Sequence, residues 1–515
     1  MQTSEMEQKG SSGSQKWHLS MFVILIGTSM AVLDSSIVNV AISAMMHDFQ
    51  TTTSRIQWVV TIYMLALGVV VPTSGWLGDY FGYKRLYTYA LAVFTLGSLF
   101  CSLSWSENVL IVARVVQATG GGMIMPTTMS MIYSLVPRNK MGSAMGAFGI
   151  AMVVAPALGP TIGGYLVQYI NWRWIFTINL PIGVIGVFLA LTVLPEFPHR
   201  KASKFDYWGS ITSSASLFCL LLALSQGQDW GWSSLGIVML FFFSFSLMVL
   251  FVLHELTVPD PLLDLRVFKY PAFSLGNLLL VIVTVGMYGG LFYVPLFLQS
   301  IRGLGALKAG LLMLPPALAS GIALPVSGKI YDRYGPFFPV STGILLLALS
   351  TYLLTGLNLE TPLSSIIGWN MIRSLGMGLT MMPVQTSIMS VLPTEQVGRG
   401  SAITNIVSRV AGSFGLAFLT IMLNDKLAYH TSYLCWTIPS DNLNTLLNSG
   451  LYSKETILSL LQANIYKVAF VQAIDDMFWI TCFITLSGLL LTYFLPRKAK
   501  KNDNRGLNPN HQMEV

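Results

Sequence analysis

An acidic residue in the middle of an apolar run is the first candidate for chemistry. Asp34 lies in LDSSIVNVAI (residues 33–42), inside the apolar stretch from Leu19 to Met45. A carboxylate at the centre of a membrane helix costs about 2.5–3.5 kcal/mol on insertion, and intramembrane acids usually serve function. Because desolvation favours the neutral form, we predict that Asp34 binds and releases a proton. The alternative is a structural acid, paired with Arg114 or hydrogen-bonded by Ser35.

A second polar pair lies in another apolar run. Arg114 and Gln117 are three residues apart, so they share one face of a helix. A buried arginine needs an anionic partner or water, and Asp34 is the nearest candidate by topology. The pair either exchanges its salt bridge for a proton or is permanent, and the sequence leaves both possibilities open.

The elements that position these residues are membrane helices. The 515-residue chain is 53% hydrophobic and only 10% charged, against about 25% charged in soluble domains. Apolar runs long enough to span a bilayer occupy nearly all of it. We predict fourteen spans, near residues 18–45, 56–77, 86–104, 109–133, 142–168, 173–194, 207–226, 233–256, 272–299, 307–329, 336–357, 363–390, 400–423 and 473–495. The four cysteines lie in apolar runs or stand alone, so no disulfide or metal cluster is expected.

Loop charges predict the orientation. Of the 29 Lys and Arg residues, 19 fall on the side of both termini, 7 on the other side and 3 within spans. Cytoplasmic loops are enriched in Lys and Arg, so we expect both termini in the cytoplasm of a cell whose cytoplasmic membrane holds this multi-pass protein. The net charge of +7 then reflects topology rather than nucleic-acid binding.

An internal repeat divides the chain. GWLGDYFGYKR (residues 75–85) is echoed by SGKIYDRYG (residues 327–335), and Gly142-Ser143-Ala144 recurs as Gly400-Ser401-Ala402. We predict an all-α fold of two six-helix bundles, residues 18–194 and 272–495, with linkers and two inserted spans at 195–271. Residues 1–17 and 496–515 are expected to be cytoplasmic tails, and residues 498–515 are expected to be disordered. The outer loop 424–472 is expected to carry an amphipathic helix capped by Ser453, either a packing lid or a docking surface for an adaptor protein.

With these segments assembled, the chain resembles the major facilitator superfamily, and more narrowly the fourteen-span drug:proton antiporters of the EmrB and QacA type. The resemblance runs through LDSSIVNVAI, GWLGDYFGYKR, RVVQATGGG (114–122), AFGIAMVVAPALGPTIGG (147–164) and NWRWIFTINLPIG (171–183), and continues through FDYWG (205–209), PLLDLRVF (261–268) and GRGSAITNIVSRVAGSFG (398–415). It departs at Ala118, where the family usually has Gly, and in the truncated second copy of the loop motif. The resemblance implies that the first-span acid, here Asp34, couples protons.

Two segments are predicted to act in gating. Small residues recur every fourth position from Ala147 to Gly163, giving a groove for close helix packing, and prolines soften that helix. The resemblance implies that this segment, the antiporter motif of the family, is a gate. In the loop motif we expect a conformational latch with cations pairing across the halves, although a purely topological role for Lys84 and Arg85 is the alternative. The candidates are Pro156, Gly159, Pro160 and Gly163 for the gate, and Gly75, Gly78, Asp79, Gly82, Lys84, Arg85, Asp332 and Arg333 for the latch.

A broad apolar cavity is expected to bind substrate. The candidates are Asn39, Tyr63, Gln117, Met123, Tyr288, Phe292, Tyr293 and Arg409, although ordinary packing is the alternative for each aromatic or methionine. Arg373 and Arg409 lack obvious acidic partners. They either donate to helix carbonyls or attract an anionic group of the substrate.

The function predicted from these residues is secondary active export. Protons would move inward in exchange for an amphipathic, lipophilic cationic drug or toxic compound, driven by the proton-motive force without a cofactor or metal. Nucleotide-hydrolysis, metalloprotease and esterase motifs are absent from the sequence, so an enzyme is not expected. The alternatives are export of a lipid, fatty acid or other anionic metabolite, and a non-transporting sensor or scaffold. A periplasmic adaptor is a possible partner, and nucleic acid is not.

Overall fold

The chain folds into a bundle of long helices. The computed structural model describes residues 2–137, 140–197, 205–393, 396–437 and 454–495. The first half comprises α1 (Gln2–Asp48), α2 (Thr53–Ile56), α3 (Trp58–Phe81), α4 (Tyr83–Ser102), α5 (Glu107–Leu135), α6 (Met141–Tyr169), α7 (Trp174–Thr177) and α8 (Asn179–Val193). The second half comprises α11 (Pro271–Leu296), η3 (Phe297–Ile301), α12 (Ala306–Tyr334), α13 (Phe337–Leu354), α14 (Leu363–Ser390), α15 (Val397–Thr437) and α17 (Lys454–Thr492). Between them lie α9 (Tyr207–Trp230), α10 (Leu235–Thr257) and η2 (Leu265–Lys269).

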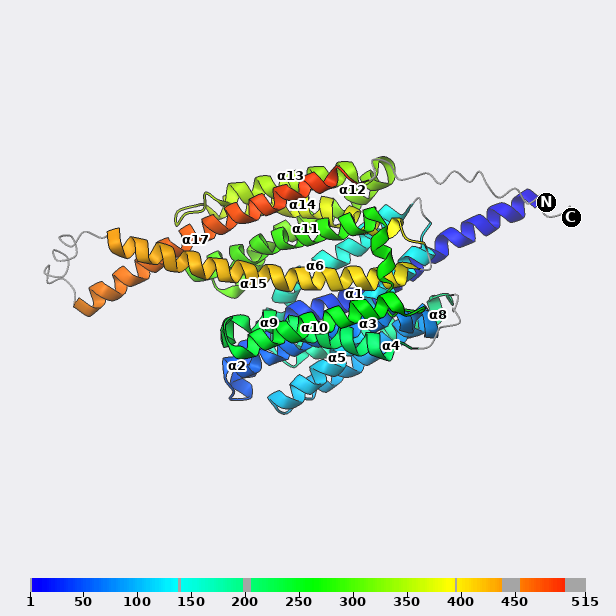
Figure 1. The fold of residues 1–515 in the computed structure, drawn as a ribbon, viewed down its shortest axis with the longest axis horizontal. Coiled ribbons are helices and arrows are strands. Elements are labelled where there is room, and N and C mark those ends of the chain that lie inside the picture. Colours follow the sequence, from blue (N-terminus) through cyan, green and yellow to red (C-terminus); the bar gives the residue numbers. More distant parts are fainter. Residues whose placement is uncertain (1, 138–139, 198–204, 394–395, 438–453, 496–515) are drawn as a thin grey trace.

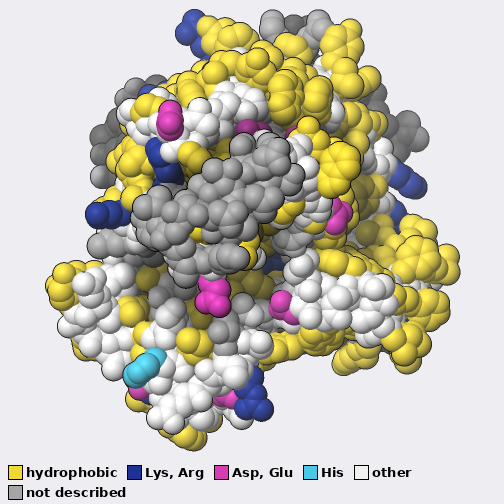
Figure 2. Space-filling model, turned by 90° about the vertical axis from the view of Figure 1, so that its left-hand side faces the viewer, with side chains coloured by type: hydrophobic (Ala, Val, Ile, Leu, Met, Phe, Trp, Pro, Cys, Tyr) yellow, Lys and Arg dark blue, Asp and Glu magenta, His cyan; other side chains and the backbone are white. Residues whose placement is uncertain are grey.

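Twelve helices of the described chain are long and apolar enough to cross a membrane. Helices α4 and α14 occupy the positions of the other two expected spans but are less apolar. Large side chains are exposed on the outside of the bundle, for example Phe242, Phe243 and Phe245 of α10. Figure 2 shows hydrophobic side chains gathered along the flanks of the molecule. This distribution suits a protein whose outer surface contacts lipid.

Several helix boundaries differ from those predicted. Helix α1 begins at Gln2, so the expected tail continues the first helix. Helices α15 and α17 extend into the outer segment, and the helix expected there is continuous with the last span. Ser453 and residues 496–515 lie outside the described residues. Polar segments can continue a helix when nothing breaks it, which apolar periodicity alone does not reveal.

The ends of the helices follow from local sequence. Ser106 accepts a hydrogen bond from Val109 N at 3.4 Å at the start of α5, and Asp206 accepts one from Gly209 N at 2.9 Å at the start of α9. Gly82 has φ of 84°, a conformation that favours glycine, and it separates α3 from α4 by a single residue. This turn and the corresponding turn at Gly335, between α12 and α13, lie at one end of the bundle. We call this end the base, and it is the right-hand end in Figure 1.

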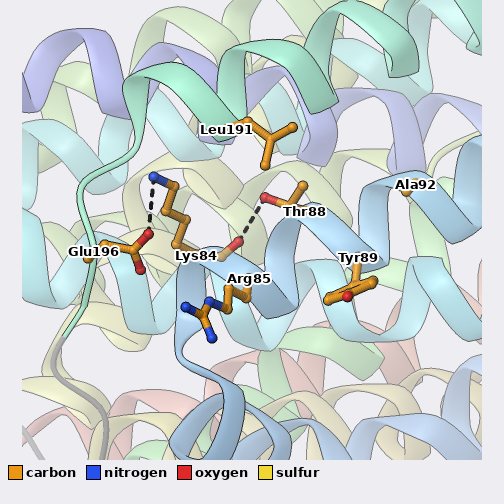
Figure 3. A pocket seen from close by; sticks show the side chains of 7 residues that line it. All are labelled: Lys84, Arg85, Thr88, Tyr89, Ala92, Leu191 and Glu196. Atoms are coloured by element: carbon orange, nitrogen blue, oxygen red, sulfur yellow. Dashed lines mark hydrogen bonds and ion pairs between the residues drawn. The ribbon is translucent and has the colours of Figure 1, made fainter.

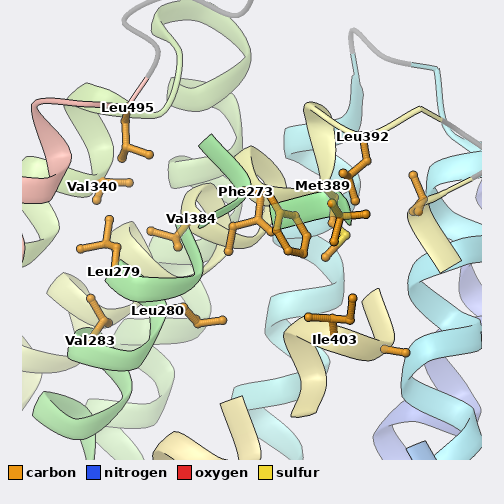
Figure 4. Packing of buried hydrophobic residues seen from close by; sticks show 14 of the residues in the cluster. Phe273, Leu279, Leu280, Val283, Val340, Val384, Met389, Leu392, Ile403 and Leu495 are labelled. Carbon is orange, nitrogen blue, oxygen red and sulfur yellow. The ribbon is translucent and has the colours of Figure 1, made fainter. Parts of the chain in front are cut away.

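The halves lie side by side, with the inserted pair packed on the first half (Figure 1). Some hydrophobic clusters lie within one half, and others join the halves, such as the one that joins Phe148 of α6 to Leu324 of α12. One cluster, mostly from the second half, joins α11, α13, α14, α15 and Leu495 around Phe273, Val340 and Val384, all at most 1% exposed (Figure 4). Across the halves, α6 and α12 contact each other along their length. Added Cβ atoms on Gly142 or Gly328 would meet backbone of the other helix, so glycine is needed for this approach.

Candidate functional site

Two of the charged residues predicted to lie within spans, Asp34 and Arg114, form a buried ion pair. Asp34 on α1 and Arg114 on α5 are both 0% exposed, and Arg114 Nη1 lies 2.6 Å from Asp34 Oδ2. Helix α1 supplies the acid from the middle of its apolar part, Trp17–Asp48, and α5 places Arg114 two turns from its start. Because each charge is removed from water, each depends on the other for compensation.

Amide groups complete the coordination of the carboxylate. Gln117 Nε2 donates to Asp34 Oδ1 at 2.8 Å, and Asn179 Nδ2 donates to the same oxygen at 2.8 Å. Gln117 also donates to Ser98 Oγ at 2.7 Å and accepts from Arg114 at 2.6 Å. Asn179 and Ser98 were not among the site residues predicted from the sequence. The available signal was an asparagine between apolar residues in NWRWIFTINLPIG, at the break between α7 and α8.

The guanidinium of Arg114 is held on its other sides by α3. Its Nε donates to Val59 O at 3.2 Å, and its Cζ lies 3.8 Å from the centre of the Tyr63 ring. The face of an aromatic ring attracts a guanidinium electrostatically at such a distance. Its Nη2 has no hydrogen-bond partner among the described residues. The network therefore joins α1, α3, α4, α5 and α8 around one buried carboxylate.

Tyr63 connects this network with the second half. The side chain was a candidate for the substrate path, and it lies instead beneath Arg114, 1% exposed. Its hydroxyl also interacts electrostatically with Arg409 on α15. Tyr63 thus lies between the cations of the two halves.

The small-residue groove of α6 packs against α1. A Cβ on Gly159 would collide with Ser36, and one on Gly163 would lie 2.8 Å from Ile37 Cγ1. Pro156 and Pro160 lie within α6, and Pro160 Cβ would lie 3.6 Å from a Cβ on Gly310 of α12. The predicted close approach is present, and it is made two residues from Asp34.

The loop motif joins the halves at the base. Asp79, near the end of α3, lies 3.5 Å from Arg399 Nε in the first turn of α15, and Tyr83 donates to Asp79 at 2.9 Å. Gly75 lies directly beneath Arg399, and Gly78 beneath the Tyr83 ring. The acid of the motif, rather than its cations, makes the contact between halves.

The prediction that Lys84 pairs across the halves is wrong. Lys84 Nζ lies 3.4 Å from Glu196 Oε1, which belongs to the segment after α8 of the same half (Figure 3). Arg85 is exposed. The pairing follows from the fold, because α8 ends beside the start of α4 and brings Glu196 within reach.

The second copy of the motif makes the matching contact. Asp332 on α12 accepts hydrogen bonds from Gly142 N at 2.9 Å and Ser143 N at 3.3 Å, at the start of α6 in the first half. A carboxylate at this position compensates the exposed N–H groups and the positive end of the helix dipole. Arg333 is exposed. The repeat seen in the sequence is thus a pair of acids, each meeting a helix of the opposite half.

A cavity of about 310 Å³ lies between the halves. Helices α5 and α6 line it from the first half, and α11, α12, α14 and α15 line it from the second. Seven methionines contribute: Met125, Met129, Met152, Met287, Met377, Met381 and Met382. Of the predicted path residues, Tyr288 and Arg409 line this cavity.

The remaining candidates lie elsewhere. Asn39 is exposed on α1, and Met123 borders a separate hollow beside α3 and α4. Tyr293 is buried, donates to Leu419 O at 2.8 Å and packs with Phe292 in a core cluster. Arg373 donates to the carbonyls of Gly286 and Met287, which confirms the expectation of carbonyl partners for this arginine.

Two six-helix halves that enclose a central cavity, with a buried ion pair in the first half, are the architecture of a membrane transporter. The model of the Major Facilitator Superfamily matches residues 24–416, and the chain belongs to that family. It is 33% identical to the uncharacterized MFS-type transporter YhcA of Bacillus subtilis over 96% of both chains. It is 32% identical to the lincomycin resistance protein LmrB of Listeria monocytogenes, over 82% of this chain and 90% of that one.

The fold has solved counterparts. The crystal structure of the human organic anion transporter MFSD10 superposes with a TM-score of 0.60, covering 92% of this chain and 99% of that one at 13% identity. The likeness shows that the helices are arranged as in other transporters of this fold. No group of three or more His, Cys, Asp or Glu that could hold a metal ion occurs among the described residues.

Proposed function

We propose that this transporter exports an amphipathic compound in exchange for protons across the cytoplasmic membrane. Similarity to a lincomycin resistance protein supports outward transport, because a resistance protein of this family would act by removing the compound from the cell. The single observation that carries proton coupling is the buried Asp34–Arg114 pair, which Tyr63 links to Arg409 in the lining of the central cavity. The proton-motive force takes the place of a cofactor.

Protonation of Asp34 would change the contacts of two helices. The neutral acid no longer compensates Arg114, which would retain Gln117, Val59 O and the rings of Tyr63 and Phe176 as partners. The contact between α1 and α5 would therefore weaken when a proton binds. Loss of the proton would restore it.

This local change can reach the gate. Helix α1 packs against Gly159 and Gly163 of α6 at the residues that follow Asp34, and the opposite side of α6 packs against α12. A movement of α1 would thus be transmitted to the interface between the halves. Alternation of that interface is what exposes a central site to one side and then the other.

In this structure the contacts of Asp79 and Asp332 join the two halves at the base. Along α15, Arg399 and Arg409 are ten residues apart, so the cavity lies about 15 Å above the base. We assign the base to the cytoplasmic side, with both termini there and all fourteen long helices crossing the membrane. Access from the cytoplasm would then require both acid contacts to open.

Transport in proteoliposomes tests the proposal. Wild-type protein should move substrate against an imposed pH gradient, and Asp34→Asn should lose gradient-driven flux while retaining substrate exchange. The matched control is Arg55→Gln, which removes a charge from a pair with Glu107 that is exposed on the arginine side. Undiminished gradient-driven transport by Asp34→Asn would overturn the assignment.

A further inference from the structure

The central cavity carries one unpaired cation. Arg409 lines it, and no Asp or Glu lies within ion-pair distance of this arginine among the described residues. The charge of Asp34 is already compensated by Arg114 at 2.6 Å. An arginine keeps its charge in a protein, so Arg409 holds a positive charge beside an apolar space.

Other polar atoms beside the cavity also lack partners. Arg409 Nε, Gln385 Oε1, Thr284 Oγ1 and Ser320 Oγ are buried and make no hydrogen bond within the described chain. Buried polar atoms are normally hydrogen-bonded. Four such atoms around one space indicate that the space is filled by a molecule with polar groups of its own.

The rest of the lining is apolar and adaptable. Methionines dominate it, and their flexible, polarizable side chains can repack around bodies of different shape. The lining contains no acidic side chain. A lipophilic cation would therefore meet an uncompensated positive charge, whereas an anionic group would compensate it.

We infer that Arg409 is the specificity determinant of this cavity and that the exported compound carries an anionic group, such as a carboxylate, on an apolar body. The guanidinium binds the anion through charge-assisted hydrogen bonds, Gln385 and the hydroxyl groups bind further polar atoms, and the methionines enclose the body. This inference rests on the proposed export function, and it replaces the lipophilic cation expected from the sequence with the anionic alternative.

Equilibrium binding to purified protein in lipid nanodiscs, without a gradient, tests the inference. The probes share one body: naphthylbutyrate, its uncharged amide naphthylbutyramide, and naphthylpropyl-trimethylammonium. Wild-type protein should bind the anion about tenfold more tightly than the amide, which corresponds to about 1.4 kcal/mol, and should bind the cation most weakly.

Variants assign the preference to one side chain. Arg409→Gln should bind anion and amide equally while binding the amide as wild type does, which also shows that the variant is folded. Arg409→Lys should retain part of the preference, and Arg55→Gln all of it. Equal binding of anion and cation by wild-type protein, or an unchanged anion preference in Arg409→Gln, would overturn the inference.

Proton coupling is tested separately. If Asp34→Asn keeps gradient-driven transport but wild-type protein prefers the anion in this binding assay, the coupling proposal fails and the assignment of Arg409 stands. If Asp34→Asn loses gradient-driven transport but the three probes bind alike, the inference about Arg409 fails and the coupling proposal stands.

Discussion

Removing one member of the buried pair should cost more than removing both. Asp34→Asn leaves Arg114 fully buried with a charge that it cannot lose, and Arg114→Met leaves a buried carboxylate that retains only the Gln117 and Asn179 amides. Breaking a buried pair in this way destabilises proteins by about 3–5 kcal/mol. The double variant carries no buried charge at this site, so it should be more stable than Asp34→Asn.

The two single variants should also differ in their response to pH. In Arg114→Met the uncompensated carboxylate can be neutralised by a proton. The loss of stability relative to the wild-type protein should therefore shrink as pH falls. In Asp34→Asn the remaining charge is that of Arg114, so the loss of stability of this variant should not shrink as pH falls. The sign of this difference follows from which charge is left.

Thermal unfolding of detergent-purified protein, followed by reaction of a thiol-specific dye with the buried Cys101 and Cys482, measures these effects. Arg55→Gln is the control, because its pair with Glu107 is exposed on the arginine side and such pairs contribute only about 0–1 kcal/mol. The reasoning would be refuted if the double variant lost as much stability as the two single variants together, since the stability changes of independent sites add and those of coupled sites do not.

Three further predictions concern the helices around the site. Gly159→Val should lower the free energy of unfolding by about 1–3 kcal/mol because its side chain collides with α1, whereas Gly368→Val, whose Cβ enters open space, should not; equal stability of the two variants would contradict the packing described. Asp332→Asn should raise severalfold the alkylation rate of a cysteine introduced at Asn405 beside the cavity, because the base opens more often; an unchanged rate would argue against a latch. Asn179→Leu should reduce proton-coupled flux at wild-type protein levels, measured in proteoliposomes, and full flux would show that its hydrogen bond to Asp34 is dispensable.

Much of the architecture was predictable from the sequence. Apolar runs and their spacing place the helices, because a spanning helix must contact lipid or other helices along its whole length. The lone acid in the first run and the Arg114–Gln117 spacing identified the main pair of the site, since a charge in such surroundings requires a partner. The duplicated loop motif also anticipated that Asp79 and Asp332 act at equivalent positions.

Only the tertiary structure decided which side chains meet. Asn179, Ser98 and Tyr63 join Asp34 because α3, α4 and α8 pack around α1 and α5, and no local pattern encodes that arrangement. The partner of Lys84 proved to be Glu196 for the same reason. The unpaired state of Arg409 is likewise a property of its neighbours, because a sequence shows that a cation is present, whereas its compensation depends on residues far away along the chain.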